Sequence, residues 1–143
     1  MRALRVDKLT YAALEATLDS YLCGRSLEEI PALAAFHTNK DTILSRARAF
    51  VQRVSLIDGF HFNLSDGGSV IGGGSAPETL LPTTLIGVTN EHLTPDEIEK
   101  RLRHNVPPVI VRIVENQVIL DLRTVPTEAE TELIEAFHRI SVH

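Results

Sequence analysis

The chain has 143 residues, a mass of 15.8 kDa and a net charge of −5 at pH 7, which is the size of one domain. A hydrophobic content of 43% excludes a wholly disordered chain, and the acidic balance excludes a basic surface that coats nucleic acid, although not a small local patch. One cysteine, Cys23, excludes an internal disulfide framework, and no apolar run is long enough to cross a bilayer. We expect a reduced, cytoplasmic domain.

The first expected helix covers apolar residues that recur at helical spacing from Tyr11 to Leu22. Thr10 is placed to cap its start, and Gly24 is placed to end it. We expect Glu29-Ile30 to be extended, because Pro31 disfavours a helical conformation just before it and suits the first turn of a new, short helix.

A longer helix is expected next. Its apolar residues share one face between Ile43 and Val54, which predicts that this face is buried. Arg46 and Arg53 fall largely on the opposite face. This arrangement favours a solvated basic surface rather than a binding site.

After this helix, the spacing of apolar residues changes from the helical period to the two-residue period of strands. Phe60–Leu64 alternates apolar and polar side chains, as a strand does. Asp66-Gly67-Gly68 is typical of a turn, after which Ser69–Ile71 is expected to return as a second strand. Thr83–Thr89 is expected to form a third.

Two later helices carry local start signals. Thr94-Pro95-Asp96-Glu97 combines a cap, a proline at the first helical position and a glutamate that closes a capping box. It predicts a helix to about Arg103. Thr127–Glu130 is expected to open the last helix, which is acidic in its first turn and carries His138 and Arg139 in its last, as the helix dipole favours.

Between these helices, Val109–Val114 and Gln117–Leu122 are β-rich runs joined by Glu115-Asn116, which predicts a hairpin. A two-residue loop places the following residues opposite one another: Ile113 and Val118, Arg112 and Ile119, Ile110 and Asp121. One face of the hairpin is then apolar. The other carries Arg112, Asp121 and Arg123 among isoleucines.

This order of elements predicts an α+β fold with a small, mostly antiparallel sheet covered by helices. We expect a single domain, with residues 1–55 as a helical segment that leads into an α/β sandwich core at residues 56–143.

Few residues form patterns that carry chemistry. The six histidines lie in separate elements without metal-ligand spacing, so no metal site is expected. The run Gly72-Gly73-Gly74-Ser75 lets backbone amides approach a ligand, although an ordinary loop has the same composition. Arg2 and Arg5 are three residues apart and would clamp one anion in a helix or tight turn; the alternative is a frayed N-terminus.

Several segments match one family in the same order and span nearly the whole chain. They are Arg2–Thr10, Ala12–Leu18, Glu29–Pro31, Gly72–Pro77, Pro107–Ile110, Arg112–Ile113 and Leu120–Val125. Together they resemble the region that follows the pyridoxal-phosphate (PLP) domain of bacterial selenocysteine synthase, the L-seryl-tRNA(Sec) selenium transferase family. Glu78 stands where that family usually has a glycine.

The resemblance implies the small C-terminal α+β domain of a fold type I PLP enzyme. It implies a homo-oligomer that converts seryl-tRNA(Sec) to selenocysteinyl-tRNA(Sec) with selenophosphate as the selenium donor. Lys8, Lys40 and Lys100 do not lie in the motif of the cofactor-binding lysine. The resemblance therefore implies that the large PLP-binding domain is absent from this segment, that the cofactor is held elsewhere, and that the isolated chain is inactive.

The resemblance also suggests roles for individual residues. Arg2 and Arg5 match family arginines placed to hold the anionic selenium donor, for which a planar guanidinium is suited. Gly72, Gly73, Gly74 and Ser75 match a candidate active-site loop. Arg112 and Arg123 match the family pattern, with either a substrate-binding role or a structural role in which one pairs with Asp121.

A second hypothesis comes from a different class of protein. In this alternative the chain is a free-standing, non-catalytic relative that serves as a binding or oligomerisation module. An upstream reading frame that carries the cofactor lysine would favour the enzyme, and a separate start site at Met1 would favour the module.

Overall fold

A computed structural model describes residues 5–70 and 80–141, and contacts divide the chain into two compact units. The first unit is Met1–Thr38 and the second is Asn39–His143. The boundary precedes the long helix α4 (Lys40–Val54), which the sequence grouped with the earlier helices. This helix belongs to the second unit because it packs on the sheet and supplies part of the core.

The described residues of the first unit form three helices: α1 (Lys8–Leu22), α2 (Ser26–Glu29) and α3 (Pro31–His37). Asp7, not Thr10, caps α1. The Asp7 carboxylate accepts hydrogen bonds from the Thr10 backbone N–H at 2.8 Å and from the Thr10 hydroxyl at 3.1 Å, and these bonds lower the pKa of Asp7. Gly24 ends the helix as expected, with a φ of +71° that favours glycine.

Glu29 is helical rather than extended, and the reason is a local network. Its carboxylate accepts hydrogen bonds from the Ser20 hydroxyl at 2.6 Å and from Arg25 Nε at 2.5 Å. The Ser20 bond, followed by the Arg25 bond, lowers the pKa of Glu29. The change to extended backbone is confined to Ile30, and Pro31 begins α3 as predicted.

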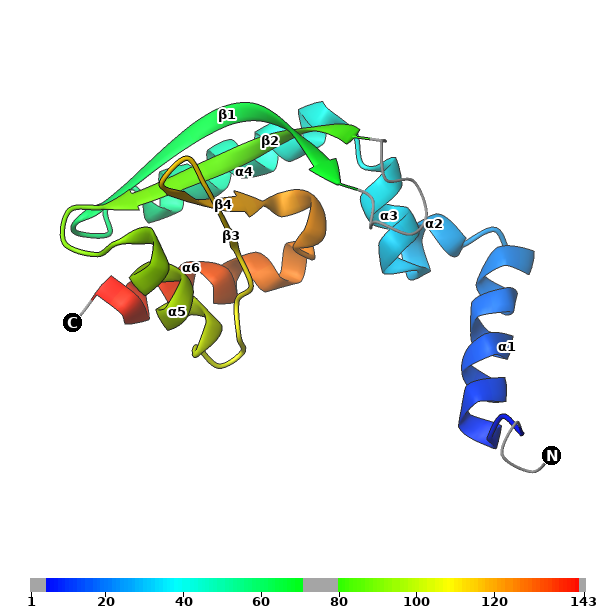
Figure 1. The fold of residues 1–143 in the computed structure, drawn as a ribbon. Coiled ribbons are helices and arrows are strands. Elements are labelled where there is room, and N and C mark those ends of the chain that lie inside the picture. Colours follow the sequence, from blue (N-terminus) through cyan, green and yellow to red (C-terminus); the bar gives the residue numbers. More distant parts are fainter. Residues whose placement is uncertain (1–4, 71–79, 142–143) are drawn as a thin grey trace. The chain divides into compact units, whose positions relative to one another are not determined.

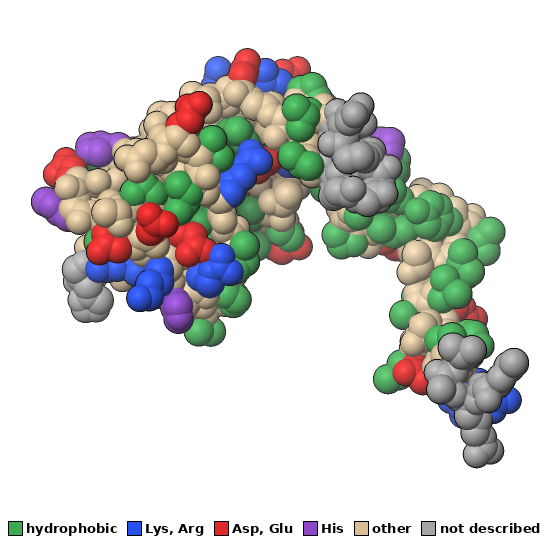
Figure 2. Space-filling model, in the orientation of Figure 1, with side chains coloured by type: hydrophobic (Ala, Val, Ile, Leu, Met, Phe, Trp, Pro, Cys, Tyr) green, Lys and Arg blue, Asp and Glu red, His purple; other side chains and the backbone are tan. Residues whose placement is uncertain are grey.

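Most apolar side chains of the first unit are exposed. Leu14, Leu18 and Tyr21 each expose more than half of their surface, and Ser20 is the one residue of α1 that is buried. Hydrophobic side chains are visible along the surface of this unit in Figure 2.

The second unit is built on a four-stranded antiparallel sheet within the described residues. Its strands are β1 (Phe60–Val70), β2 (Leu80–Asn90), β3 (Arg112–Val114) and β4 (Gln117–Asp121), in the order β1-β2-β4-β3 (Figure 1). This architecture confirms the α+β fold class. The expected order of five strands was wrong, because the first two form one strand.

The predicted turn at Asp66-Gly67-Gly68 is continuous β-strand. β1 pairs with β2 along its whole length, with Gly67 opposite Thr83 and Gly68 opposite Pro82. A Cβ atom on Gly67 would lie 2.3 Å from Leu85 Cδ1, and one on Gly68 would lie 3.0 Å from the Leu80 Cβ. The glycines therefore make room for leucine side chains of the neighbouring strand rather than turning the chain.

The β3–β4 hairpin has the predicted register at Arg112–Ile119 and Ile113–Val118. Glu115 and Asn116 both have positive φ values, 48° and 59°, as a two-residue hairpin turn requires. The ladder begins at Arg112 and does not include Ile110, whose pairing with Asp121 was therefore wrong.

The helices of the second unit pack on one face of the sheet (Figure 1). Besides α4 they are α5 (Pro95–Arg103), α6 (Glu130–Ser141) and the short 3₁₀ turns η2 (Leu122–Thr124) and η3 (Thr127–Ala129). The Thr94–Glu97 capping box of α5 is confirmed. The expected helical start at Thr127 forms η3, and α6 itself begins at Glu130.

The core lies between this face and the helices. Phe137 is fully buried and makes edge-to-face contacts with Phe50, Phe60 and Phe62, with ring centroids 5.3–6.5 Å apart. Aliphatic side chains from α4, β2, α5, β4 and α6 complete the core: Ile43, Val54, Ile86, Val88, Ile98, Leu102, Val118, Leu120, Leu133 and Ile140.

Arg46 is not part of a solvated basic face. Its Nε donates to Glu130 Oε1 at 2.7 Å, and its Nη2 donates to the Val125 carbonyl at 2.6 Å. The two charged side chains are mostly shielded from water, at 19% and 13% exposed. The pair joins α4 to the start of α6.

Candidate functional site

A cluster of polar side chains joins three strands at one end of the sheet. The Asp121 carboxylate, at the end of β4, accepts hydrogen bonds from the Ser69 hydroxyl on β1 at 2.5 Å and the Thr83 hydroxyl on β2 at 3.0 Å. It also accepts the backbone N–H of Arg123 at 3.0 Å. Asp121 is thereby held by groups from β1, β2 and η2.

Arg123 is buried against the same cluster, with 7% of its surface exposed. Its Nε donates to the Ser69 hydroxyl at 3.1 Å, and its Nη2 donates to the Pro82 carbonyl at 2.7 Å. Ser69 thus links the Arg123 guanidinium to the Asp121 carboxylate. A buried guanidinium requires such partners, and these contacts favour the structural alternative for Arg123 over substrate binding.

Arg112 is in the opposite situation. It is exposed on β3, and its side chain makes no hydrogen bond or ion pair with any described residue.

Arg112 lines two grooves on the surface. One, of about 320 Å³, lies where residues 109–111 diverge from β4 and is lined by Ile110, Asp121 and Leu133. The other, of about 430 Å³, lies over the sheet beside Asn63 and Gln117. Of Arg112 and Arg123, the two arginines that match the family pattern in this unit, Arg112 is therefore the accessible one.

The remaining candidates are only partly described. Arg5 precedes α1 and is exposed, whereas Arg2 lies outside the described residues. The run Gly72-Gly73-Gly74-Ser75 also lies outside them. The convergence of the two N-terminal arginines on one anion remains a prediction.

The described residues do not fit PLP by themselves. Lys8 and Lys100 are exposed on α1 and α5, and the Lys40 ammonium forms an ion pair with the Asp66 carboxylate at 2.8 Å. A PLP site needs a lysine in an enclosed pocket beside groups that hold the phosphate and the pyridine ring. None of these three lysines lies in such surroundings.

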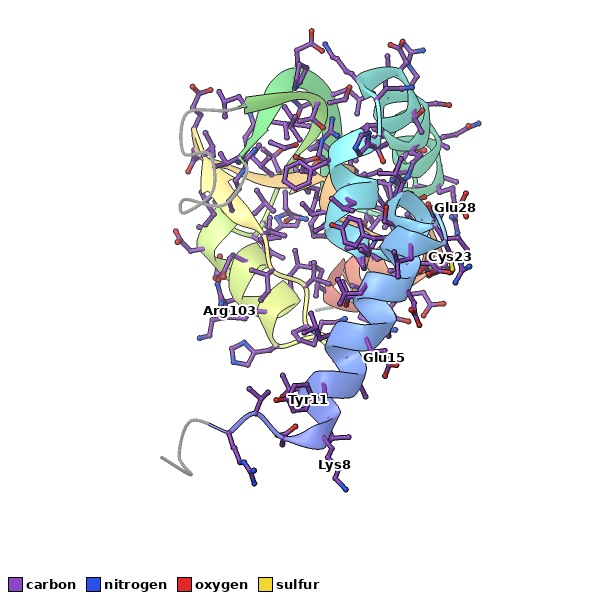
Figure 3. All side chains as sticks on the ribbon, turned by 90° about the vertical axis from the view of Figure 1, so that its right-hand side faces the viewer. Lys8, Tyr11, Glu15, Cys23, Glu28 and Arg103 are labelled. Carbon is purple, nitrogen blue, oxygen red and sulfur yellow. The ribbon has the colours of Figure 1, made fainter. Side chains whose placement is uncertain are left out.

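The described residues also show no arrangement that indicates a metal site or a membrane span. No group of three or more histidine, cysteine, aspartate or glutamate side chains there is arranged to hold a metal ion. Cys23 is exposed beside the end of α1 (Figure 3). No described helix is both long and apolar enough to cross a membrane.

Comparison with known sequences decides the family. The sequence profile described as SelA, L-seryl-tRNA selenium transferase, matches residues 1–126 of this chain. The chain belongs to this family. It is 37% identical over 141 residues to the L-seryl-tRNA(Sec) selenium transferase of Clostridium botulinum strain 657, an alignment that covers 97% of this chain and 30% of the relative.

Relatives from other bacteria agree. The L-seryl-tRNA(Sec) selenium transferase of Geobacter sulfurreducens is 38% identical over 144 residues, which covers 99% of this chain and 31% of the relative. That of Geobacter metallireducens is 41% identical over 127 residues, covering 87% and 28%. This member of the SelA family thus spans about 30% of the length of the curated relatives it matches.

Sequence reasoning missed Ser69 and Thr83, which hold Asp121. The alternation of side chains along the strands could have identified them, but both residues were assigned to strands without regard to the face on which they lie. Once β1 is continuous, Ser69 and Thr83 fall on the same face as Asp121. Asp121 is paired with Leu85, Thr83 lies two residues from Leu85 on β2, and Ser69 lies two residues from the partner of Thr83 on β1; residues that are paired or two apart share a face.

Proposed function

We propose that this SelA-family chain contributes the C-terminal domain of an enzyme that converts seryl-tRNA(Sec) to selenocysteinyl-tRNA(Sec), with selenophosphate as selenium donor. The observation that carries the proposal is the family match over residues 1–126, which includes Arg2, Arg5, Arg112 and Arg123. The enzyme is proposed to be a cytoplasmic homo-oligomer.

In this proposal Arg2 and Arg5 hold the selenium donor. Selenophosphate is a tetrahedral oxyanion, and a guanidinium offers two parallel N–H donors to such an anion and keeps its charge at any physiological pH. The exposure of Arg5 in this chain is compatible with that role, because the side chain is free to reach a ligand.

PLP is proposed to be the cofactor and to be held by residues outside this segment, since the described lysines do not fit it. The isolated chain is then expected to be inactive and to form no stable adduct with PLP. The measurement is an absorbance spectrum after addition of PLP and dialysis. A stoichiometric bound band that disappears in Lys8→Ala would contradict this assignment.

A chimera tests the function directly. Residues 1–143 would replace the aligned segment of the Geobacter sulfurreducens enzyme, and conversion of purified seryl-tRNA(Sec) would be measured with selenophosphate. We expect selenium-dependent product. A chimera that folds and binds PLP and seryl-tRNA(Sec) but forms no product would refute the proposal for this chain.

The same chimera tests the arginines. Arg2→Ala or Arg5→Ala is expected to weaken the dependence on selenophosphate by roughly ten- to a hundredfold, because each charge-assisted hydrogen bond contributes about 1.5–3 kcal/mol. Lysine at either position should restore only part of the loss, and seryl-tRNA(Sec) binding should change little. If tRNA affinity collapsed while donor dependence stayed the same, a role on the tRNA backbone would replace the anion clamp.

A further inference from the structure

The sheet has a second face, which α4, α5 and α6 leave open. Four residues form one row across this open sheet face, in the strand order of Figure 1: Asn63 on β1, Gly87 on β2, Ile119 on β4 and Arg112 on β3. Directly paired residues of neighbouring strands point to the same side, so their side chains share this face. The row thus has an amide at one end, a guanidinium at the other and a glycine between them.

Two amide side chains converge over Gly87 in this row. A Cβ atom at Gly87 would lie 2.4 Å from Gln117 Oε1 and 2.6 Å from Asn63 Oδ1. The ends of both amide side chains therefore stand directly over the glycine. A side chain at this position would displace them.

The polar side chains around Gly87 are without hydrogen-bonding partners among the described residues. The side chains of Asn63, Gln117 and Arg112 make no hydrogen bond or ion pair with any residue that the structure describes. With Leu85 and Ile119 they line the groove of about 430 Å³, which is within the size range of small-molecule sites. The groove is therefore polar at its walls and apolar between them.

These groups together fit a nucleotide. Primary amides bind the edge of adenine through paired donor and acceptor atoms, and a guanidinium binds phosphate. The aliphatic side chains of Leu85 and Ile119 offer an apolar surface to a base. The groove is lined by one guanidinium, that of Arg112, and by two carboxylates, those of Glu115 and Asp66, of which Asp66 is paired with Lys40. A single cation beside these acidic groups suits one base with one phosphate rather than a long polyanion.

We propose that the open sheet face binds one nucleotide of single-stranded RNA, with Asn63 and Gln117 on the base and Arg112 on the phosphate. The choice of RNA over an extended acidic peptide rests on the proposed function, in which the substrate is a tRNA. Binding itself does not require the transferase reaction, so the two proposals fail separately.

The test is a titration of the 143-residue chain, labelled with ¹⁵N, followed by amide chemical shifts. Adenosine monophosphate should perturb residues around Gly87 and should bind more tightly than adenosine or inorganic phosphate alone. Arg112→Ala should weaken adenosine monophosphate at least tenfold, toward the affinity of adenosine. Gly87→Ala should weaken both adenosine and adenosine monophosphate, because its methyl group displaces the amides.

Arg103→Ala is the matched control. It removes the same charge from an exposed arginine of α5 (Figure 3), and it should leave binding unchanged.

The salt dependence of binding gives a second measurement. For a tetranucleotide of adenylate, a plot of the logarithm of the association constant against the logarithm of the salt concentration should have a slope of about −0.7, as one phosphate contact predicts. Arg112→Ala should bring this slope close to zero.

Three results would overturn the proposal. They are shifts that map away from the open sheet face, equal effects of Arg112→Ala and Arg103→Ala, and tighter binding of an acidic tetrapeptide than of adenosine monophosphate. If the chimera makes selenocysteinyl-tRNA(Sec) while these results are obtained, the nucleotide site is wrong and the proposed function stands. If nucleotide binding behaves as expected but the chimera makes no selenocysteinyl-tRNA(Sec), the nucleotide site stands and the proposed function is wrong.

Discussion

The two units of the chain bury their apolar side chains to very different degrees. In the second unit, Ile43, Phe50, Val88 and Phe137 are at most 1% exposed, between a sheet and helices. In the first unit, Leu14, Leu18 and Tyr21 remain 52–55% exposed. Both units contain helices with apolar side chains, but only the second unit has a sheet against which its helices bury such side chains, and a core requires two such facing surfaces.

The largest expected difference between the units concerns stability. Phe137→Ala should destabilise the second unit by about 3–5 kcal/mol, because it leaves a cavity among three other aromatic rings. Leu18→Ala, in the first unit, should change stability by less than about 0.5 kcal/mol.

Urea unfolding can separate the two units. The chain has no tryptophan, and both tyrosines, Tyr11 and Tyr21, lie in α1, so tyrosine fluorescence reports the first unit and circular dichroism reports both. Phe137→Ala should move the dichroism transition and leave the tyrosine signal in place. A concerted shift of both signals would show that the units unfold together.

The two units should also differ in their tendency to self-associate. The exposed apolar face of α1 should draw two copies together, since such patches tend to find partners. Leu18→Glu should weaken association about ten- to a hundredfold, as the loss of one buried leucine predicts. Light scattering over a concentration series measures it.

The matched control for self-association lies in the other unit. Leu56 is 92% exposed but isolated from α1 in sequence, and Leu56→Glu should leave association unchanged. A clean monomer at high concentration would contradict the expectation and favour an autonomous module.

A smaller effect is expected from the ion pair that joins α4 and α6. Arg46→Ala should cost about 2 kcal/mol, because Glu130 keeps its charge in shielded surroundings and the Val125 carbonyl loses a donor. Arg48→Ala, on the exposed side of the same helix, serves as control. Equal unfolding midpoints for the two variants in urea would contradict the assignment.

The smallest effect concerns pH and the first unit. Folding lowers the pKa of Glu29 through bonds from Ser20 and Arg25, so its contribution to stability is present above the ordinary value of 4.5 and is lost as pH falls through the lowered pKa. Helicity of the first unit should therefore decline in acid. Glu29→Gln should reduce this acid dependence and Glu28→Gln should not, as measured by tyrosine fluorescence between about pH 2 and 6.

Elements with short-range signals were predicted correctly. The Thr94–Glu97 capping box, the stop at Gly24 and the register of the β3–β4 hairpin each depend on residues a few positions apart. Local hydrogen bonds and allowed backbone angles decide such features, and both can be inferred from neighbouring residues.

Elements that depend on distant partners were not predicted. Asp66-Gly67-Gly68 has the composition of a turn, yet pairing with β2 and the approach of Leu85 make it strand. Arg46 has the spacing of a solvated residue, yet Glu130, 84 positions away, draws it into a shielded pair. No local pattern contains that information.

The candidate site divides in the same way. From the sequence alone, the ordered segments indicated the family, and Arg112 and Arg123 were singled out together as equivalent candidates. Only the tertiary structure separated them: Arg123 is buried against Ser69 and Pro82, 54 and 41 positions away, whereas Arg112 lines an open groove together with Asn63 and Gln117. The physical reason is that residue type and spacing determine what a side chain is able to bind, while the pairing of distant strands determines which partners reach it.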